Sequence, residues 1–204
     1  MAESIEIRIL SKVKKAKRGS LFFTDSFASI GNAKAVSKAL ERMVKSGEMY
    51  RVSAGMYVRP VEDPVVGTVL PGIDEITTAI AKREKARIVP TGSYAMYKLG
   101  LSTQVPMNVV YYTDGSARKI HIGKQTITFK RASAKSVSAI GEISRLAIQA
   151  LRSIGQDHVT ETEVKKIREI LKKEKPYHLQ HDLTLSPVWI RKIIGPIKTS
   201  SPNE

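Results

Sequence analysis

Residues 24–59 read TDSFASIGNAKAVSKALERMVKSGEMYRVSAGMYVR, and their pattern predicts the structure of the N-terminal part of the chain. Thr24 and Asp25 are both good helix N-caps, so a short helix is expected from here to Ile30. Gly31-Asn32 then supplies a tight turn, because both residues tolerate the backbone angles that turns require. The stretch therefore begins as a helix followed by a turn.

A second helix is expected over residues 33–46, and its two faces differ in character. At 100° per residue, one face is apolar and is expected to be buried, with Val36, Leu40, Met43 and Val44. The opposite face is mostly basic and holds Lys34, Lys38, Glu41, Arg42 and Lys45. Gly47 then ends the helix.

Two short strands, residues 49–53 and 56–59, are expected after the second helix. Ala54-Gly55 lies between them and is typical of a hairpin turn. Tyr50 and Tyr57 alternate with apolar residues and are expected to be at least partly buried. A helix, a turn, a basic helix and a hairpin in this order indicate a winged helix-turn-helix, a module that places its second helix in the major groove of DNA.

The composition limits the classes of partner. The 204 residues include 34 Lys and Arg against 19 Asp and Glu, and the resulting net charge of +15 attracts polyanions such as nucleic acid. An anionic membrane surface is the alternative, but no apolar run approaches the roughly 20 residues of a transmembrane helix, and the N-terminus has no signal-peptide pattern. The absence of Cys excludes disulfides and cysteine zinc sites and fits a cytoplasmic protein.

The sequence also predicts the structure of the segments on either side of the winged helix. Residues 4–14 predict an amphipathic helix capped by Ser4, and residues 20–23 predict an extended segment. Residues 61–72 are rich in Pro and Gly and are predicted to be a linker. We therefore expect a winged-helix domain over 1–60, a C-terminal domain over 73–197 and a frayed tail over 198–204.

The C-terminal domain is expected to combine helices with an antiparallel β-meander, so that the whole chain is of the α/β (α+β) class. Strands are predicted at residues 88–90, 108–113, 119–122 and 125–131, with Asp114-Gly115 and Gly123 as turns. Helices are predicted at residues 74–86, 93–99, 140–154, 161–173 and 185–194.

Candidate DNA contacts lie on the second helix and on the hairpin. Polar residues at the start of a recognition helix reach base edges, and basic residues further along bind phosphates. The candidates are Asn32, Lys34, Ser37, Lys38, Arg42, Lys45, Arg51 and Arg59. The alternative is that these charges only solvate a core helix and discourage strand aggregation. The basic cluster Lys12–Arg18 fits either phosphate contact or a solvated loop.

A second group of basic residues lies on the predicted strands of the C-terminal domain. Its members are Arg118, Lys119, Lys124, Lys130 and Arg131. They fit an extension of the DNA footprint, a surface for RNA or a protein partner, or simple solvation of the strands. The sequence leaves these three alternatives open.

The sequence resembles the AbiEi type of antitoxin, from bacterial abortive-infection and type IV toxin–antitoxin systems. The resemblance covers roughly residues 4–135. It is carried by the block FFTDSFASIGNAKAVSKALERMVKSGEMYRVSAGMYVRP, in which Gly47 precedes Met49-Tyr50-Arg51-Val52 and Gly55 precedes Met56-Tyr57-Val58. A second cluster is similar to the start of that family's C-terminal domain, and comprises Pro90–Ala95, Leu99-Gly100-Leu101 and the strand Val109–Thr113.

This resemblance implies a sequence-specific DNA-binding repressor that autoregulates its operon, usually through an inverted repeat upstream. It also implies a functional partner, a nucleotidyltransferase-like toxin, which antitoxins of type IV pairs need not touch. The alternatives are a winged-helix protein-interaction module and a transcriptional regulator without an antitoxin role. Duplex DNA is the expected partner, and no membrane partner is expected.

No enzymatic site is expected. Nucleotidyl transfer needs two carboxylates to hold two metal ions, and residues 101–112 contain neither Asp nor Glu. The glycines form no phosphate-binding loop of the GxxxxGK[ST] or GxGxxG type. His178, His181 and Asp182 are metal-ligand types, but nothing nearby completes a site, and a surface loop is expected there. We therefore expect no catalytic residues, no metal ion and no cofactor.

Overall fold

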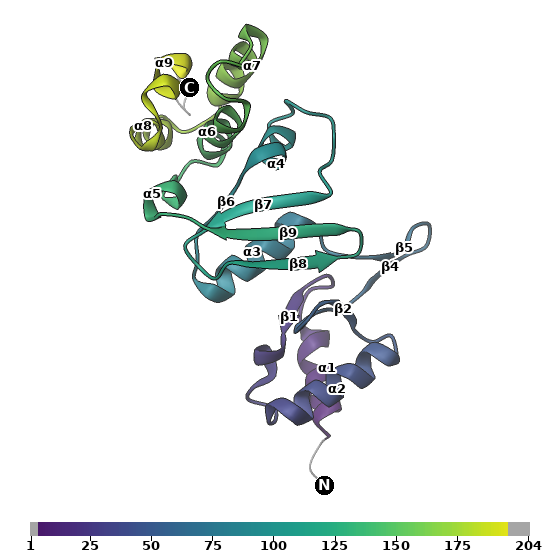
Figure 1. The fold of residues 1–204 in the computed structure, drawn as a ribbon. Coiled ribbons are helices and arrows are strands. Elements are labelled where there is room, and N and C mark those ends of the chain that lie inside the picture. The colour runs from purple at the N-terminus through teal and green to yellow at the C-terminus, as the bar shows by residue number, and fades with distance from the viewer. Residues whose placement is uncertain (1–3, 196–204) are drawn as a thin grey trace, which may run out of the picture. The chain divides into compact units, whose positions relative to one another are not determined.

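The chain folds into two compact units, residues 1–80 and 81–204. The structure, a computed structural model, describes residues 4–195 (Figure 1). The division falls inside helix α3 (Ile73–Glu84) and not within the segment 61–72 that the sequence predicts as a linker. The predicted tail, 198–204, lies outside the described residues.

The predicted linker is instead a β-hairpin. Strands β4 (Val61–Asp63) and β5 (Gly67–Val69) pair antiparallel. The Asp63 carboxylate accepts hydrogen bonds from the backbone N–H of Val65 (2.8 Å) and of Val66 (3.0 Å), which closes the turn. The same two bonds lower the pKa of Asp63. Of the residues that suggested a linker, Pro64 lies in the turn of this hairpin and Gly67 begins its second strand.

The N-terminal unit contains the winged helix that the sequence predicts. Its sheet has β3 in the centre, paired antiparallel with β1 on one side and β2 on the other. The β2–β3 hairpin is the wing, and its turn contains Gly55 at φ +71°. The elements are α1 (Ile5–Lys15), β1 (Leu21–Phe23), the 3-10 turn η1 (Thr24–Phe27), α2 (Ala33–Lys45), β2 (Tyr50–Ser53) and β3 (Met56–Val58).

The first helix of the helix-turn-helix is shorter than predicted. It is a single 3-10 turn, η1, and it does not extend as a helix to Ile30. At its start the Ser26 hydroxyl accepts the backbone N–H of Phe23 at 3.0 Å, so the predicted caps Thr24 and Asp25 lie inside the turn. Short polar side chains stabilise turns of this kind in competition with a longer helix. By contrast, Ser4 caps α1 as predicted.

The C-terminal unit is built around a four-stranded sheet with the order β6-β7-β9-β8. β6 pairs antiparallel with β7, and β8 pairs antiparallel with β9, but β7 and β9 run parallel. The predicted antiparallel meander is therefore wrong, because β9 rather than β8 lies next to β7. The strands are β6 (Ile88–Pro90), β7 (Asn108–Thr113), β8 (Arg118–Ile122) and β9 (Gln125–Arg131).

The carboxylate of Asp114, directly after β7, is bonded to the residue that precedes β6. It accepts the backbone N–H of Arg87 at 2.7 Å and the Arg87 Nε at 2.8 Å, just before β6 begins. These bonds lower the pKa of Asp114. Asp114-Gly115 therefore ties the end of β7 to the start of β6 and does not form the β7–β8 hairpin turn predicted for it.

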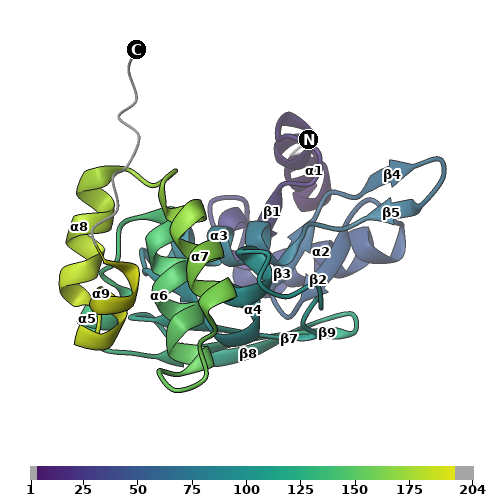
Figure 2. The same cartoon turned by 90° about the horizontal axis from the view of Figure 1, so that it is seen from above.

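Helices complete the C-terminal unit, and α6, α7, α8 and α9 lie grouped together (Figures 1 and 2). Their shared core includes Ala147, Leu151, Ile167, Leu171 and Ile190. The surface loop predicted around His178 is wrong, since these residues form α8, which begins with Pro176 at its first position. The helices are α4 (Gly92–Lys98), α5 (Ala134–Val137), α6 (Glu142–Ile154), α7 (Glu161–Leu171), α8 (Pro176–Leu185) and α9 (Val188–Ile194).

Two buried carboxylates close the N-terminus of α6. Glu174, 6% exposed, accepts the backbone N–H of Ile143 (2.7 Å) and of Ser144 (3.0 Å). Asp182, 0% exposed, accepts the N–H of Ile140 (2.8 Å) and of Gly141 (2.9 Å). The first N–H groups of a helix have no partner within it, so residues from beyond α7 supply the acceptors that α6 lacks.

Candidate nucleic-acid interface

Helix α2 presents the predicted pair of faces. Val36, Ala39, Leu40 and Met43 are buried in the core of the N-terminal unit, while Val44 is only partly buried. The exposed face carries all the polar residues predicted for it: Lys34, Ser37, Lys38, Glu41, Arg42 and Lys45. Thirteen residues at about 1.5 Å per residue make a helix of roughly 20 Å, which is long enough to cross a major groove about 12 Å wide.

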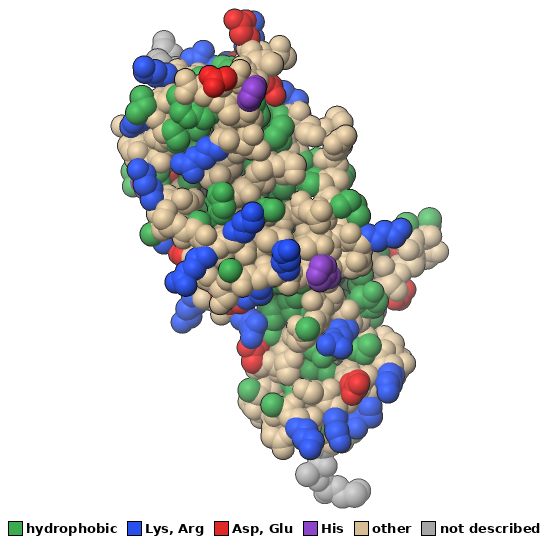
Figure 3. Space-filling model, in the orientation of Figure 1, with side chains coloured by type: hydrophobic (Ala, Val, Ile, Leu, Met, Phe, Trp, Pro, Cys, Tyr) green, Lys and Arg blue, Asp and Glu red, His purple; other side chains and the backbone are tan. Residues whose placement is uncertain are grey.

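Three lysines on this face are free. Within the described residues, Lys34, Lys38 and Lys45 make no ion pair and no side-chain hydrogen bond. Figure 3 shows Lys and Arg side chains gathered along the part of the surface that α2 occupies in Figure 1. An uncompensated row of cations on one helix face creates a positive potential that attracts phosphate groups. We refer to Lys34, Lys38 and Lys45 as the α2 lysine row.

Other predicted DNA contacts are partly engaged within the protein. Asn32 caps α2, because its Oδ1 accepts the backbone N–H of Ala35 at 2.9 Å, which leaves only its amide N–H₂ group for other contacts. Arg42 donates its Nε to the carboxylate of Glu6 on α1. Sequence periodicity placed Arg42 on the correct face, but it could not reveal a partner 36 positions away.

The wing contributes one free cation. Arg51 is exposed on β2 and has no side-chain partner in the described part of the chain. Arg59 is less available, because its Nη1 donates to the backbone oxygen of Lys14 at 3.3 Å. Tyr57 is buried as expected, whereas Tyr50, at 43% exposure, is not. Tyr50 lies at the start of β2, an edge strand, where both it and the adjacent Arg51 are exposed.

Basic residues of α1 have a structural task that sequence reasoning missed. Arg8 donates to the backbone oxygens of Ile30 (3.1 Å) and of Ser29 (3.5 Å). Lys12 donates to the backbone oxygen of Ser26 and lies over the Phe27 ring, 5.7 Å from its centroid. Part of the Lys12–Arg18 cluster therefore holds the segment before α2 in place. The spacing of Arg8 and Lys12 by four residues was the available signal.

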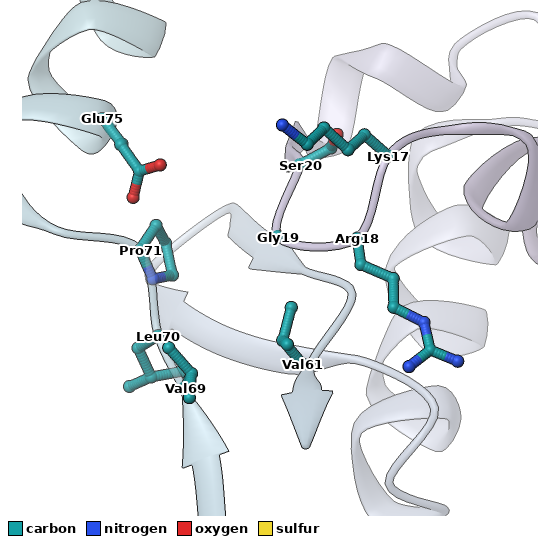
Figure 4. A pocket seen from close by; sticks show the side chains of 9 residues that line it. All are labelled: Lys17, Arg18, Gly19, Ser20, Val61, Val69, Leu70, Pro71 and Glu75. Carbon is teal, nitrogen blue, oxygen red and sulfur yellow. The ribbon is translucent and has the colours of Figure 1, made fainter. Parts of the chain in front are cut away.

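A hollow of about 320 Å³ lies in the N-terminal unit between the loop after α1 and the β4–β5 hairpin (Figure 4). Lys17 and Arg18 border it, but their side chains leave the loop in different directions. Glu75, the acidic residue of the lining, accepts the backbone N–H of Gly72 at 2.9 Å. The divergent cations and the carboxylate do not converge on one point, so this hollow lacks the geometry of an anion site.

The second basic group predicted on the strands does not form one surface. Strand register places Lys119 opposite Thr128, and Tyr112 opposite Lys130, so Lys119 and Lys130 share one face of the sheet. Arg118 lies on the other face, where it pairs with Glu84 and covers the Phe129 ring at 5.3 Å. Lys124 lies in the β8–β9 turn, and Arg131 ends β9.

The face that Lys119 and Lys130 share is open, and we refer to it as the outer face. His121 also belongs to it, because alternate residues of β8 point the same way. All three side chains are exposed, and Thr126 and Thr128 between them are half-buried. The outer face therefore carries polar and basic groups, whereas Tyr111, Ile127 and Phe129 on the opposite face are buried.

The histidines that were considered as metal ligands pair with carboxylates of the protein itself. His181 Nδ1 lies 2.9 Å from the Asp182 carboxylate, and His178 Nδ1 lies 3.5 Å from that of Glu174. Across residues 4–195, no group of three or more His, Cys, Asp or Glu side chains is arranged to hold a metal ion. Among the helices of the same residues, none has the length and apolar character needed to span a membrane.

The fold and the basic face together define a two-unit α+β protein with an N-terminal winged helix. Residues 8–179, well over half of the chain, match DUF6088, described as a family of unknown function, and the chain belongs to this family. No curated protein matches the chain. Among solved structures, the chain is similar to the RV2827C protein from Mycobacterium tuberculosis, with 10% sequence identity and a TM-score of 0.46 over 95% of this chain and 82% of that chain.

Proposed function

We propose that the N-terminal unit binds duplex DNA through α2 and that the protein is a sequence-specific transcriptional repressor acting in the cytoplasm. The observation that carries the proposal is the α2 lysine row, three unpartnered cations on the exposed face of a helix whose other face is buried. In a winged helix this is the helix that enters the major groove. The lysines are suited to phosphates and guanine edges.

Other residues of the N-terminal unit also support a placement of α2 in the major groove. Arg51 on the wing is free to contact a phosphate beside the groove that α2 occupies. Ser37 is exposed on α2 between Lys34 and Lys38, where it reaches base edges. Arg8 and Lys12 hold the segment before α2, so the helix is presented in one orientation before DNA is bound.

We further propose that this repressor is an antitoxin of the AbiEi type that autoregulates its own operon. The support for this role is the sequence resemblance over roughly residues 4–135. On this proposal, the protein counters a nucleotidyltransferase-like toxin encoded beside it, and direct contact with the toxin is not required. Coexpression with the neighbouring gene tests the role, because survival of the host must depend on the presence of this protein.

DNA binding is tested by fluorescence anisotropy with a labelled duplex from upstream of the protein's own gene and with a shuffled duplex of equal length. We expect preference for the upstream duplex and an affinity that falls with salt, with a log–log slope of about −0.9 per phosphate contacted. Lys34→Ala and Lys38→Ala should each reduce the steepness of this slope by about 1. Lys165→Ala, an exposed lysine on α7, is the matched control and should bind as the unmodified protein does.

Two results would count against the proposal. Equal binding to both duplexes removes the claim of sequence specificity and favours a winged helix used for protein interaction. Unchanged salt slopes for Lys34→Ala and Lys38→Ala show that DNA does not contact the α2 lysine row. A thermal melt of each variant accompanies the binding data, so that unfolding is not mistaken for lost contact.

A further inference from the structure

The C-terminal unit contains a pocket that the DNA-binding proposal does not use. It has a volume of about 460 Å³, within the range of roughly 300–1,000 Å³ that small-molecule sites occupy. The end of β7, the start of α4, the β9–α5 connection and the last two turns of α6 surround it. Its lining includes Thr91, Tyr112, Ser133, Ser136, Gln149 and Arg152.

Gln149 is the unusual member of this lining. Its side chain is only 5% exposed, yet its amide makes no hydrogen bond to any residue that the structure describes. A carboxamide carries two donor hydrogens and an acceptor oxygen, so it can bond both a donor and an acceptor of one ligand. Buried polar groups in folded proteins almost always have partners. The amide of Gln149 faces the pocket without a protein partner, so it is free to bond a ligand that enters there.

The charge of the lining selects the chemistry of the ligand. Arg152 lies one turn after Gln149 on α6, and its guanidinium has no partner among the described residues. The lining contains no Asp or Glu. A free guanidinium without a competing carboxylate is suited to a phosphate group, which it binds through two parallel hydrogen bonds.

The remaining lining supplies a flat wall and hydroxyl groups. Tyr112 is half-buried at the end of β7, and its aromatic ring is the kind of surface on which bases stack. Ser133 and Ser136 engage each other at 3.0 Å, and Thr91 donates to the backbone oxygen of Val110 at 3.1 Å, so these three hydroxyls shape the rim. Lys130, opposite Tyr112 in the β7–β9 ladder, extends the positive charge onto the outer face.

We propose that this pocket binds a nucleotide, with Arg152 on the phosphate, the Gln149 amide on the edge of the base and Tyr112 against the base plane. The amide of Gln is suited to the paired donor and acceptor of adenine, so adenine is the expected base. The nucleotide is either a free monophosphate or one unit of a single strand, because both present the same base and phosphate. This site does not depend on the winged helix binding DNA.

The test is isothermal titration calorimetry of the full chain with AMP, adenosine, inorganic phosphate and UMP. We expect AMP to bind about tenfold more tightly than adenosine or phosphate alone, and more tightly than UMP. Arg152→Ala should weaken AMP about tenfold and leave adenosine unchanged. Gln149→Leu, which keeps the volume of the side chain, should weaken AMP and adenosine alike. Arg191→Ala on α9, which also removes an exposed arginine, is the control.

The binding results distinguish a free nucleotide from a single strand as the ligand, and they also test the proposal itself. A single-stranded oligoadenylate that binds more tightly than AMP, and loses affinity in Gln149→Leu, identifies a strand as the source, whereas tighter binding of AMP identifies a free nucleotide. The proposal is overturned when AMP does not bind at millimolar concentration, or when phosphate alone binds as tightly. It is also overturned when Arg152→Ala and Gln149→Leu bind AMP as Arg191→Ala does.

Discussion

Removal of the Glu174 carboxylate should uncap helix α6 and destabilise the C-terminal unit. Glu174→Ala leaves the N–H groups of Ile143 and Ser144 without their acceptors, and the Ser144 residue is fully buried. A hydrogen bond to a charged group contributes about 1.5–3 kcal/mol, so two of them give an expected loss of about 3–6 kcal/mol. This exceeds the roughly 1 kcal/mol that loss of an ordinary N-cap costs.

The pH dependence gives the experiment a second readout. Burial alone raises the pKa of Glu174, but hydrogen bonds from Ser144, Ile143 and Lys175 outweigh burial and hold it below the ordinary value of 4.5. A carboxyl whose pKa is lowered by folding stabilises the fold fully above its unfolded pKa and loses that contribution as the pH falls through its folded pKa. The difference between the native protein and Glu174→Ala should therefore shrink as the pH falls below about 4.5.

Urea denaturation followed by circular dichroism at pH 7 and at pH 3 measures both effects. Glu142→Ala is the matched control, because Glu142 is an exposed acidic residue in the first turn of the same helix. It should cost no more than about 1 kcal/mol. A loss below about 1 kcal/mol for Glu174→Ala at pH 7, or a difference that does not change between the two pH values, would refute the capping argument.

Two further changes have defined outcomes. Gly141→Ala should lower the free energy of unfolding by about 2 kcal/mol, because its Cβ would lie 2.1 Å from the Ser144 Oγ. Gly72→Ala is the control, since its Cβ would be in ordinary contact distance, and it should change the free energy of unfolding by less than about 0.5 kcal/mol. Equal urea midpoints for the two variants would contradict this prediction. Glu6→Gln should raise DNA affinity about threefold, because it releases Arg42 from its ion pair and removes a negative charge. Weaker binding in the anisotropy assay would show instead that the ion pair is needed to orient Arg42.

Local patterns in the sequence were enough to predict the winged helix. The apolar face of α2, the Ser4 cap and the Gly55 turn each depend on residues close together in the chain, and the structure confirms all three. The same reasoning was wrong about the sheet of the C-terminal unit. There β7 pairs in parallel with β9, and Asp114 of the predicted turn bonds to Arg87, 27 positions earlier; sequence periodicity predicts neither contact.

For the candidate sites too, the sequence pattern predicted local features but not contacts between distant residues. Periodicity placed Lys34, Lys38 and Lys45 on one exposed face, but it could not show that Arg42 has a partner on α1. Gln149 was not predicted as a site residue, because a single Gln in an apolar helix carries no signal by itself. Its significance comes from burial among residues of four different elements, which only the fold brings together.

The order of the four-stranded sheet has a consequence for self-association. Its two edges are β6 and β8. β6 has only three residues and ends at Pro90, which has no N–H to offer to an added strand. β8 carries Arg118 and Lys119, and charged side chains on an edge oppose strand addition. Two copies that meet on a palindromic operator would therefore have to associate through surfaces other than the edges of this sheet.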